Sequence, residues 1–397
     1  MATYRLRRFS RPETLKAIAP ERLYHFLTPH GAFLLSRGVA LPQSSQDGEL
    51  DYDKLVQVFM TPDSATPKEL IDALYYVDEM ATSAGMDALL AEAAHRGLPL
   101  PPGCDHSPAD IAVYMWLRYR DIVERKHAER YLTRIRSFDH YQMDRSCASA
   151  MKHPTDAQLA VIARELDDWF EEKKRGRGSR IIACEKDGVY WFLVRHGEPF
   201  KREESLDGDT ASTVHYRPLR YDVVVYVPQT FELWIHARSV GEKQLYLAKF
   251  GKHLFGNENA FPGTEKYTLQ PLRQLGEDAL APGDVTGIEW IKLREVQFYY
   301  GGDPWELVTY KCDDYFALLK SKNRIFPALG RIVKATFQVK FSDAKTPRSV
   351  VIKPPNIAQF TRDDDSELVE RWLEVRGFII KRELAPIEQP GKIVASA

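Results

Sequence analysis

The stretch Arg180-Ile-Ile-Ala-Cys-Glu-Lys-Asp-Gly-Val-Tyr-Trp-Phe-Leu-Val-Arg195 contains the strongest local folding signal in the chain. Asp187-Gly188 favours a two-residue turn, because both residues tolerate positive φ, and the runs on either side have the length and the β-branched and aromatic content of strands. The sequence before this hairpin has helical periodicity, and the sequence after it has mainly strand-like runs. The architecture is therefore expected to change just before residue 180.

Helix start signals dominate the first part of the chain. Thr66-Pro-Lys-Glu69 and Ser107-Pro-Ala-Asp110 each combine a capping residue with a proline at the first helical position. Thr155 is expected to cap a third helix, whose apolar face repeats at helical spacing. That face contains Leu159, Ile162, Leu166, Trp169 and Phe170. Residues 1–175 are predicted to form a mostly helical domain.

Further hairpins and single helices follow residue 180. Turn signals separate three more pairs of strand-like runs, at 221–227 with 231–237, 287–299 with 305–311, and 331–342 with 348–353. Helices are expected at 242–255, 313–322 and 364–376. Hairpins joined to single helices predict an α+β fold with an antiparallel sheet. This domain is assigned to residues 180–397, with a sub-boundary near residue 280 as an alternative and with the basic stretch 173–180 as a linker.

The composition excludes several protein classes. The 397 residues are 44% hydrophobic and 28% charged, with a net charge of −1, which is ordinary globular usage and excludes a wholly disordered chain or a disulfide scaffold. No apolar run of about 18 residues occurs, so no membrane partner is expected. The four cysteines form no CxxC pair, and we expect a cytoplasmic protein without a metal site. Glycine-rich nucleotide-binding motifs are missing, so no cofactor is expected.

The segment Leu193-Val-Arg-His-Gly-Glu-Pro199 contains an Arg-His-Gly motif after a strand-like run. It resembles the signature of the histidine phosphatase superfamily. The resemblance implies that His196 accepts a phosphoryl group and that Arg195 clamps phosphate. It covers only this short segment, and the second catalytic histidine of that family has no counterpart before a downstream glycine. The alternative is that both residues are ordinary members of a strand end.

Asp222 and Glu232 are the candidates for a different phosphate-ester chemistry. They lie on the two strands of one expected hairpin, and carboxylates on adjacent strands can hold Mg²⁺ for nuclease chemistry. The Glu-x-Lys pattern typical of such sites is missing after Glu232. The alternative is a polar residue at a turn and a cross-strand pair.

Residues 320–353 have the largest local charge, with nine basic residues and one acidic residue, a net charge of +8. Within 331–342, alternation is expected to place Ile332, Lys334 and Lys340 on one face and Val333 on the other. Such a positive hairpin suits a phosphate backbone, an acidic protein surface, or the protection of an edge strand by lysines. The expected nucleic-acid-binding residues are Lys334, Lys340, Lys345, Arg348 and Lys353.

Three functions remain open on this evidence. The leading hypothesis is a non-catalytic binding or regulatory component of a multi-protein assembly, which contacts nucleic acid through the basic hairpin and a protein partner or a second copy of itself through other surfaces. The second is an enzyme acting on phosphate esters. The third is a protein-interaction scaffold that binds no nucleic acid.

Overall fold

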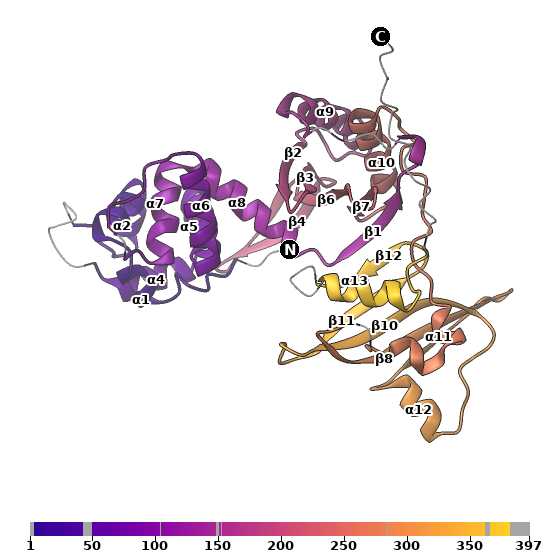
Figure 1. The fold of residues 1–397 in the computed structure, drawn as a ribbon. Coiled ribbons are helices and arrows are strands. Elements are labelled where there is room, and N and C mark those ends of the chain that lie inside the picture. Colours follow the sequence, from indigo (N-terminus) through magenta and orange to yellow (C-terminus); the bar gives the residue numbers. More distant parts are fainter. Residues whose placement is uncertain are drawn as a thin grey trace, which may run out of the picture. The chain divides into compact units, whose positions relative to one another are not determined.

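The computed structural model describes residues 4–42, 50–103, 105–147, 151, 153–283, 285–361 and 366–381. Its chain divides into two compact units (Figure 1). Unit 1 contains residues 1–132, 173–176 and 197–219, and unit 2 contains residues 133–172, 177–196 and 220–397. The predicted α+β class is confirmed, because helices fill the N-terminal part and an antiparallel sheet the rest. This division differs from the expected boundary at residue 175, since residues 133–172 belong with the sheet.

Unit 1 is a helical bundle with a hairpin. Its helices are α1 (Pro12–Lys16), α2 (Pro20–Leu27), η1 (Thr28–His30), α3 (Gly31–Ser36), α4 (Tyr52–Met60), α5 (Lys68–Met80), α6 (Ser83–His95), α7 (Pro108–Arg118) and α8 (Arg120–Thr133). The hairpin consists of β4 (Lys201–Asp207) and β5 (Thr210–Tyr216). Fully buried side chains from α2, α4, α5 and α7 form one apolar core.

The predicted caps form in two of the three helices. The Ser107 side chain accepts a hydrogen bond from the backbone N–H of Asp110, as expected for the cap of α7. Thr155 makes the matching bond at the next predicted helix. Thr66 does not cap α5, because Pro67 has an extended ψ of 130° and occupies the cap position itself. The Thr66 hydroxyl accepts a bond from Asp63 instead.

Unit 2 contains one ten-stranded sheet in the order β2-β3-β6-β7-β1-β12-β11-β10-β8-β9. The strands are β1 (Ser137–Gln142), β2 (Arg180–Lys186), β3 (Val189–Gly197), β6 (Leu219–Val227), β7 (Glu232–His236), β8 (Ile288–Gly301), β9 (Glu306–Lys311), β10 (Arg331–Phe341), β11 (Arg348–Lys353) and β12 (Ile357–Gln359). All four predicted hairpins are confirmed, and β1 and β12 join the two halves of the sheet.

The helices that pack on the first half of the sheet and those that pack on the second half lie on opposite faces of the sheet. On the first half (β2, β3, β6, β7 and β1) lie α9 (Asp156–Glu172) and α10 (Val240–Phe255). On the second half (β12, β11, β10, β8 and β9) lie α11 (Pro271–Gln274), η3 (Gly276–Leu280), α12 (Tyr315–Ser321) and α13 (Ser366–Val375) (Figure 1).

The register at β1 explains this change of face. Tyr141 pairs with Leu233, and both lie in the core under α9 and α10. Phe138 pairs with Ala358, which lies in the core under α13. Residues three positions apart on a strand point to opposite faces, whereas cross-strand partners share one. One face of the second half is therefore left to polar side chains.

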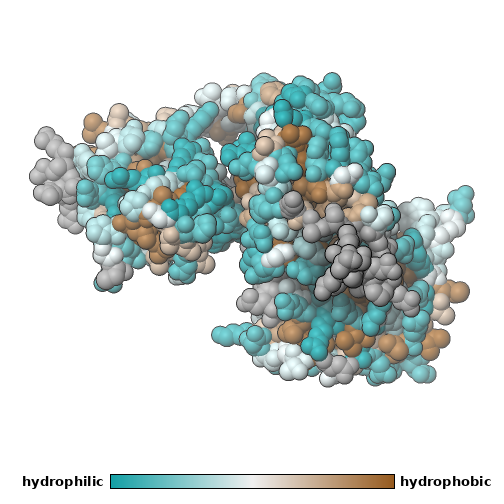
Figure 2. Space-filling view, turned by 45° about the horizontal axis from the view of Figure 1, so that its top comes forward, coloured by the Kyte–Doolittle hydropathy of each residue, from teal (hydrophilic) through white to brown (hydrophobic). Residues whose placement is uncertain are grey.

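Among the described residues, no helix is long and apolar enough to cross a membrane. The visible surface in Figure 2 is mostly hydrophilic, with separate hydrophobic patches.

Candidate nucleic-acid interface

The lysines of β10 lie on the polar face of the second half. Lys334 and Lys340 alternate with Ala335, Phe337 and Val339, which are fully buried against the helices. Ile332 is the exception to the expected alternation, because it is buried on the helix side. A bulge explains this difference: Ile332 pairs with Phe298 and Lys334 with Gln297, so Val333 is left without a partner and the pattern shifts by one residue.

Neighbouring strands extend this polar face. Lys340 pairs with Trp290 of β8, and Glu295 of β8 pairs both with Thr336 of β10 and with Lys311 of β9. We define the basic face by its basic side chains, which come from four adjacent strands. They are Lys292, Arg294, Lys311, Arg331, Lys334, Lys340 and Lys353.

Four of the basic side chains have acidic partners. Lys334 Nζ lies 2.6 Å from Glu295 Oε1, and Lys340 Nζ lies 3.2 Å from Glu289 Oε2. The Arg294 guanidinium lies 2.7 Å from Asp313, and Lys292 lies at 4.0 Å from Asp314. Seven basic against four acidic side chains leave an excess of three positive charges.

The hydrogen bond from Lys334 is the main reason why the pKa of Glu295 lies below its ordinary value, although partial burial opposes this shift. Glu295 is therefore ionised at neutral pH. It competes with any anionic ligand for Lys334.

The other predicted binding residues do not all lie on this face. Lys353 shares it, because Val351 pairs with Thr336 and residue 353 follows at the period of a strand. Lys345 is exposed in the turn between β10 and β11. Arg348 pairs with Val339, and its guanidinium lies 5.5 Å from the centre of the Phe341 ring, so it belongs to the opposite face. The structure therefore separates Arg348 from Lys334 and Lys340.

Sequence reasoning missed the basic residues of β8 and β9. β10 pairs with β8, and these strands belong to different hairpins, so their adjacency is a non-local feature. The alternation of the half-buried Trp290 and Lys292 with the buried Ile291 and Leu293 was the available signal. This alternation indicates that β8 has a polar face, but it does not indicate that β10 is the neighbouring strand.

His196 and Asp222 lie together in the core of the first half. His196 Nε2 lies 3.0 Å from Asp222 Oδ2, and the hydroxyl of Tyr246 donates a bond of 2.8 Å to the same oxygen. Arg220 Nε lies 3.2 Å from Asp222 Oδ1. The His196 ring stacks on Phe170 with 4.2 Å between the ring centres. His196, Asp222 and Tyr246 are all buried, so no substrate reaches this network in the described structure.

Glu242 lies beside His196 and Asp222, and the three side chains carry atoms that could bind a metal ion. Sequence reasoning did not identify Glu242 as a member of this group. Ligand atoms of His196, Asp222 and Glu242 lie within 4.8 Å of one another, each on a different element. Glu242 Oε2 accepts a bond of 2.6 Å from the backbone N–H of Ser239, as part of the cap of α10. A cation at this place would replace the bond between His196 and Asp222 and would lie beside the Arg220 guanidinium. Among the described residues, Asp222 Oδ1 accepts no hydrogen bond, but it lies beside the positive charge of Arg220. Asp222 Oδ2 and Glu242 Oε2 accept bonds from the protein's own donors, as in a structural polar core.

Neither phosphate-ester arrangement is assembled by these residues. Arg195 and His196 are consecutive on β3 and so point to opposite faces of the sheet. Asp222 and Glu232 lie at opposite ends of the β6–β7 hairpin, where Glu232 pairs with Val227. Five residues along a strand separate them by about 17 Å, so they cannot share one ion. Both catalytic hypotheses remain predictions without a supporting geometry.

Glu232 is engaged in a second buried network. Its Oε2 lies 2.6 Å from Lys266 Nζ and accepts a bond of 2.8 Å from Trp234 Nε1. Burial alone would raise the pKa of Glu232, but the charge of Lys266 and the neighbouring His140 hold it well below its ordinary value. Glu232 and Lys266 therefore form a buried ion pair.

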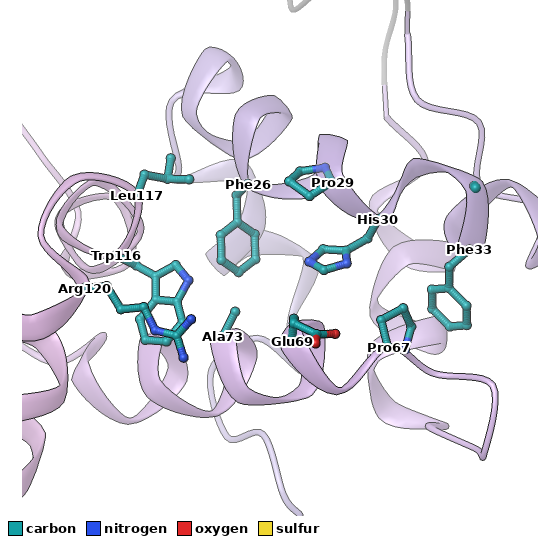
Figure 3. A pocket seen from close by; sticks show the side chains of 11 residues that line it. Phe26, Pro29, His30, Phe33, Pro67, Glu69, Ala73, Trp116, Leu117 and Arg120 are labelled. Carbon is teal, nitrogen blue, oxygen red and sulfur yellow. The ribbon is translucent and has the colours of Figure 1, made fainter.

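Unit 1 contains a groove of about 590 Å³ between helices (Figure 3). Its walls are mainly apolar, and the side chains of His30 and Glu69 lie close to each other between them. Burial lowers the pKa of His30, and the charge of Glu69 opposes this. The Trp116 ring stacks on the ring of Tyr76, and the Arg120 guanidinium lies 4.6 Å from the Trp116 ring centre. The lining residues are Phe26, Pro29, His30, Ala32, Phe33, Pro67, Glu69, Ala73, Trp116, Leu117 and Arg120.

No known protein family matches this sequence, and no curated protein is significantly similar to it.

Proposed function

We propose that this protein binds the phosphate backbone of nucleic acid through the basic face and acts as a binding component of a larger assembly. The observation that carries the proposal is the convergence of basic side chains from β8, β9, β10 and β11 on one face of the sheet. The helices α11, α12 and α13 pack on the other face of the same strands.

The ion pairs on this face are compatible with phosphate binding. Glu289 is 45% exposed, and exposed pairs of this kind contribute roughly 0.2–1 kcal/mol each, because water screens them. A phosphate can therefore replace Glu289 as the partner of Lys340 at small cost, whereas Glu295, which is only 13% exposed, holds Lys334 more strongly. Each phosphate contact also releases condensed counterions, so affinity is expected to fall steeply with salt.

Salt-dependent binding of fluorescent DNA and RNA tests the proposal. The protein would be titrated with single-stranded and duplex oligonucleotides across about 50–300 mM salt, together with the variant Lys334→Glu/Lys340→Glu. The matched control is Lys345→Glu/Arg348→Glu, which makes the same charge change in the turn and on the opposite face. Thermal unfolding of each variant would check that it is folded.

The two variants are expected to differ in their affinity for the oligonucleotides. We expect the β10 variant to lose most of its affinity and the control to lose little. Equal losses in the two variants would show that the site is not the basic face. No binding to any oligonucleotide at 50 mM salt would overturn the proposal and would leave an acidic protein surface as the partner of these charges.

A further inference from the structure

Aromatic side chains lie at both ends of the basic face, and both belong to β8. Trp290 lies beside Lys340 at one end, and Tyr299 lies beside Arg331 and Leu307 at the other. Both aromatic side chains are half-buried, so part of each ring remains exposed. Along β8 they are about 25–30 Å apart at the rise of an extended strand.

Uncharged hydrogen-bonding side chains lie between the two rings, among the lysines. Gln338 pairs with Lys292 and with Ser349, and Lys334 pairs with Gln297. Such side chains donate and accept hydrogen bonds to base edges, sugars and phosphates alike. The polar side chains between the rings are Gln297, Thr309, Thr336, Gln338 and Ser349.

A cation accompanies each ring. Lys292 Nζ lies 5.2 Å from the centre of the Trp290 ring, and the Arg331 guanidinium lies 5.7 Å from that of Tyr299. Each cation lies over one face of its ring, so a base would stack on the other face or displace the cation, and in either case a positive charge is within reach of the phosphate of that base. This combination of a stacking ring and a neighbouring cation is how sequence-tolerant proteins bind single strands.

The shape of the face does not suit a duplex. The four strands of the basic face, spaced about 4.8 Å apart, form a surface roughly 15 Å wide, whereas the major groove admits a helix or a two-stranded ribbon. In a duplex, moreover, each base already stacks on its neighbours, and the rings would have no base to bind. In a single strand the bases are free to turn toward the protein.

We propose that the basic face binds single-stranded nucleic acid, with Trp290 and Tyr299 stacking on unpaired bases and the lysines between them contacting phosphates. The proposal rests on the proposed function and specifies its ligand.

The test compares three probes of equal length, namely a 16-nucleotide oligo-dT, a 16-nucleotide oligo-U and a 16-base-pair DNA duplex. The variants Trp290→Ala and Tyr299→Ala remove the rings, and Trp290→Phe and Tyr299→Phe retain one. Tyr300→Ala and Trp305→Ala are matched controls, because Tyr300 points to the opposite face of the same strand and Trp305 is 66% exposed in the turn after it. Photocrosslinking of wild-type protein to bromouridine-containing RNA, with the adducts mapped by mass spectrometry, does not depend on a variant that folds.

We expect both single strands to bind more tightly than the duplex, and each alanine variant on the face to weaken that binding roughly 5- to 100-fold. The phenylalanine variants are expected to retain most of the affinity, the control variants to bind as the wild type does, and the adducts to map to Trp290 or Tyr299. Tighter binding of the duplex, or full affinity in both alanine variants, would overturn this inference but leave phosphate binding intact. Absence of binding to all three probes would overturn the proposed function itself. A difference between oligo-dT and oligo-U would identify which single strand is preferred.

Discussion

Lys334 Nζ lies 2.6 Å from Glu295 Oε1, across the pairing of β10 with β8, so a central lysine of the basic face has an acidic partner within the same sheet. The two side chains are 24% and 13% exposed, which leaves the pair accessible from one side. Glu295 therefore neutralises part of the field that a phosphate would meet. If the basic face binds a phosphate backbone as proposed, Glu295 in this position would weaken that binding.

Replacing Glu295 by Gln is predicted to strengthen nucleic-acid binding. The change releases Lys334 from its partner and raises the net charge of the face by one, so we expect about a two- to fivefold gain in affinity at low salt. Titration with an oligonucleotide at 50 and 300 mM salt measures the gain, which should shrink at the higher concentration. Glu374→Gln on α13 makes the same charge change beyond the opposite face, and an equal gain there would show that only net charge matters.

The hairpins of unit 2 were predictable because their signals are local. Asp187-Gly188 lies at a two-residue turn, and Asp187 has a positive φ of 54°. β1 and β12 were not predicted, because six-residue and three-residue strands are defined by their partners more than by their own sequences. Their pairing is what joins two sets of hairpins into one sheet.

The candidate site could be predicted only in part, for the same physical reason. Alternation identified Lys334 and Lys340 within one strand. It could not locate Lys292, which lies beside Gln338 only after β8 and β10 have paired. Nor could it detect the unpaired Val333, because a bulge depends on the partner strand. The meeting of His196 with Asp222 likewise depends on β3 lying beside β6.

His196→Ala is predicted to destabilise unit 2 without changing nucleic-acid binding by the folded protein. The change removes the ring stacked on Phe170 and leaves the buried Asp222 without one of its donors, which is expected to cost about 3–5 kcal/mol of unfolding free energy. Urea unfolding measures this cost. Arg195→Ala, on the other face of the same strand, is expected to cost about 1 kcal/mol or less. Similar losses for the two variants would contradict the structural role of His196.

Asp78→Asn is predicted to loosen the N-terminal segment of unit 1. The buried Asp78 carboxylate accepts backbone N–H bonds of 2.7–3.1 Å from Arg7, Arg8 and Phe9. An amide lacks the negative charge, and its NH2 group would take the place of Oδ2, which accepts the second bond from Arg7, so we expect a loss of about 2–4 kcal/mol. Hydrogen exchange should accelerate at the amides of residues 7–9. Asp72→Asn, exposed on the same helix, should leave exchange unchanged, and equally fast exchange in that variant would refute the role of Asp78.

Lys266→Met is predicted to be costly because it leaves Glu232 buried and unpaired. Lys266 Nζ lies 2.6 Å from Glu232 Oε2, and both side chains are less than a tenth exposed. Removing one member of such a pair costs about 3–5 kcal/mol, whereas removing both is close to neutral. The double variant Glu232→Gln/Lys266→Met should therefore recover most of the loss, because the new side-chain amide oxygen can still accept the bond from Trp234. A double variant no more stable than the single one would show that Lys266 acts by packing alone.

The pH dependence of stability distinguishes charge from packing at the same pair. In the wild type the pKa of Glu232 is held below its unfolded value, so the pair contributes its full stability above about pH 4.3 and loses it as the pH falls further. In Lys266→Met the charge of Lys266 is lost and only His140 still favours the ionised carboxylate, so burial is expected to raise the pKa of Glu232 and protonation should now stabilise the fold. The unfolding free energy of the variant, relative to that of the wild type, should therefore rise as the pH falls from 7 to 4. A difference that stays constant across that range would mean that Glu232 carries no uncompensated charge in the variant.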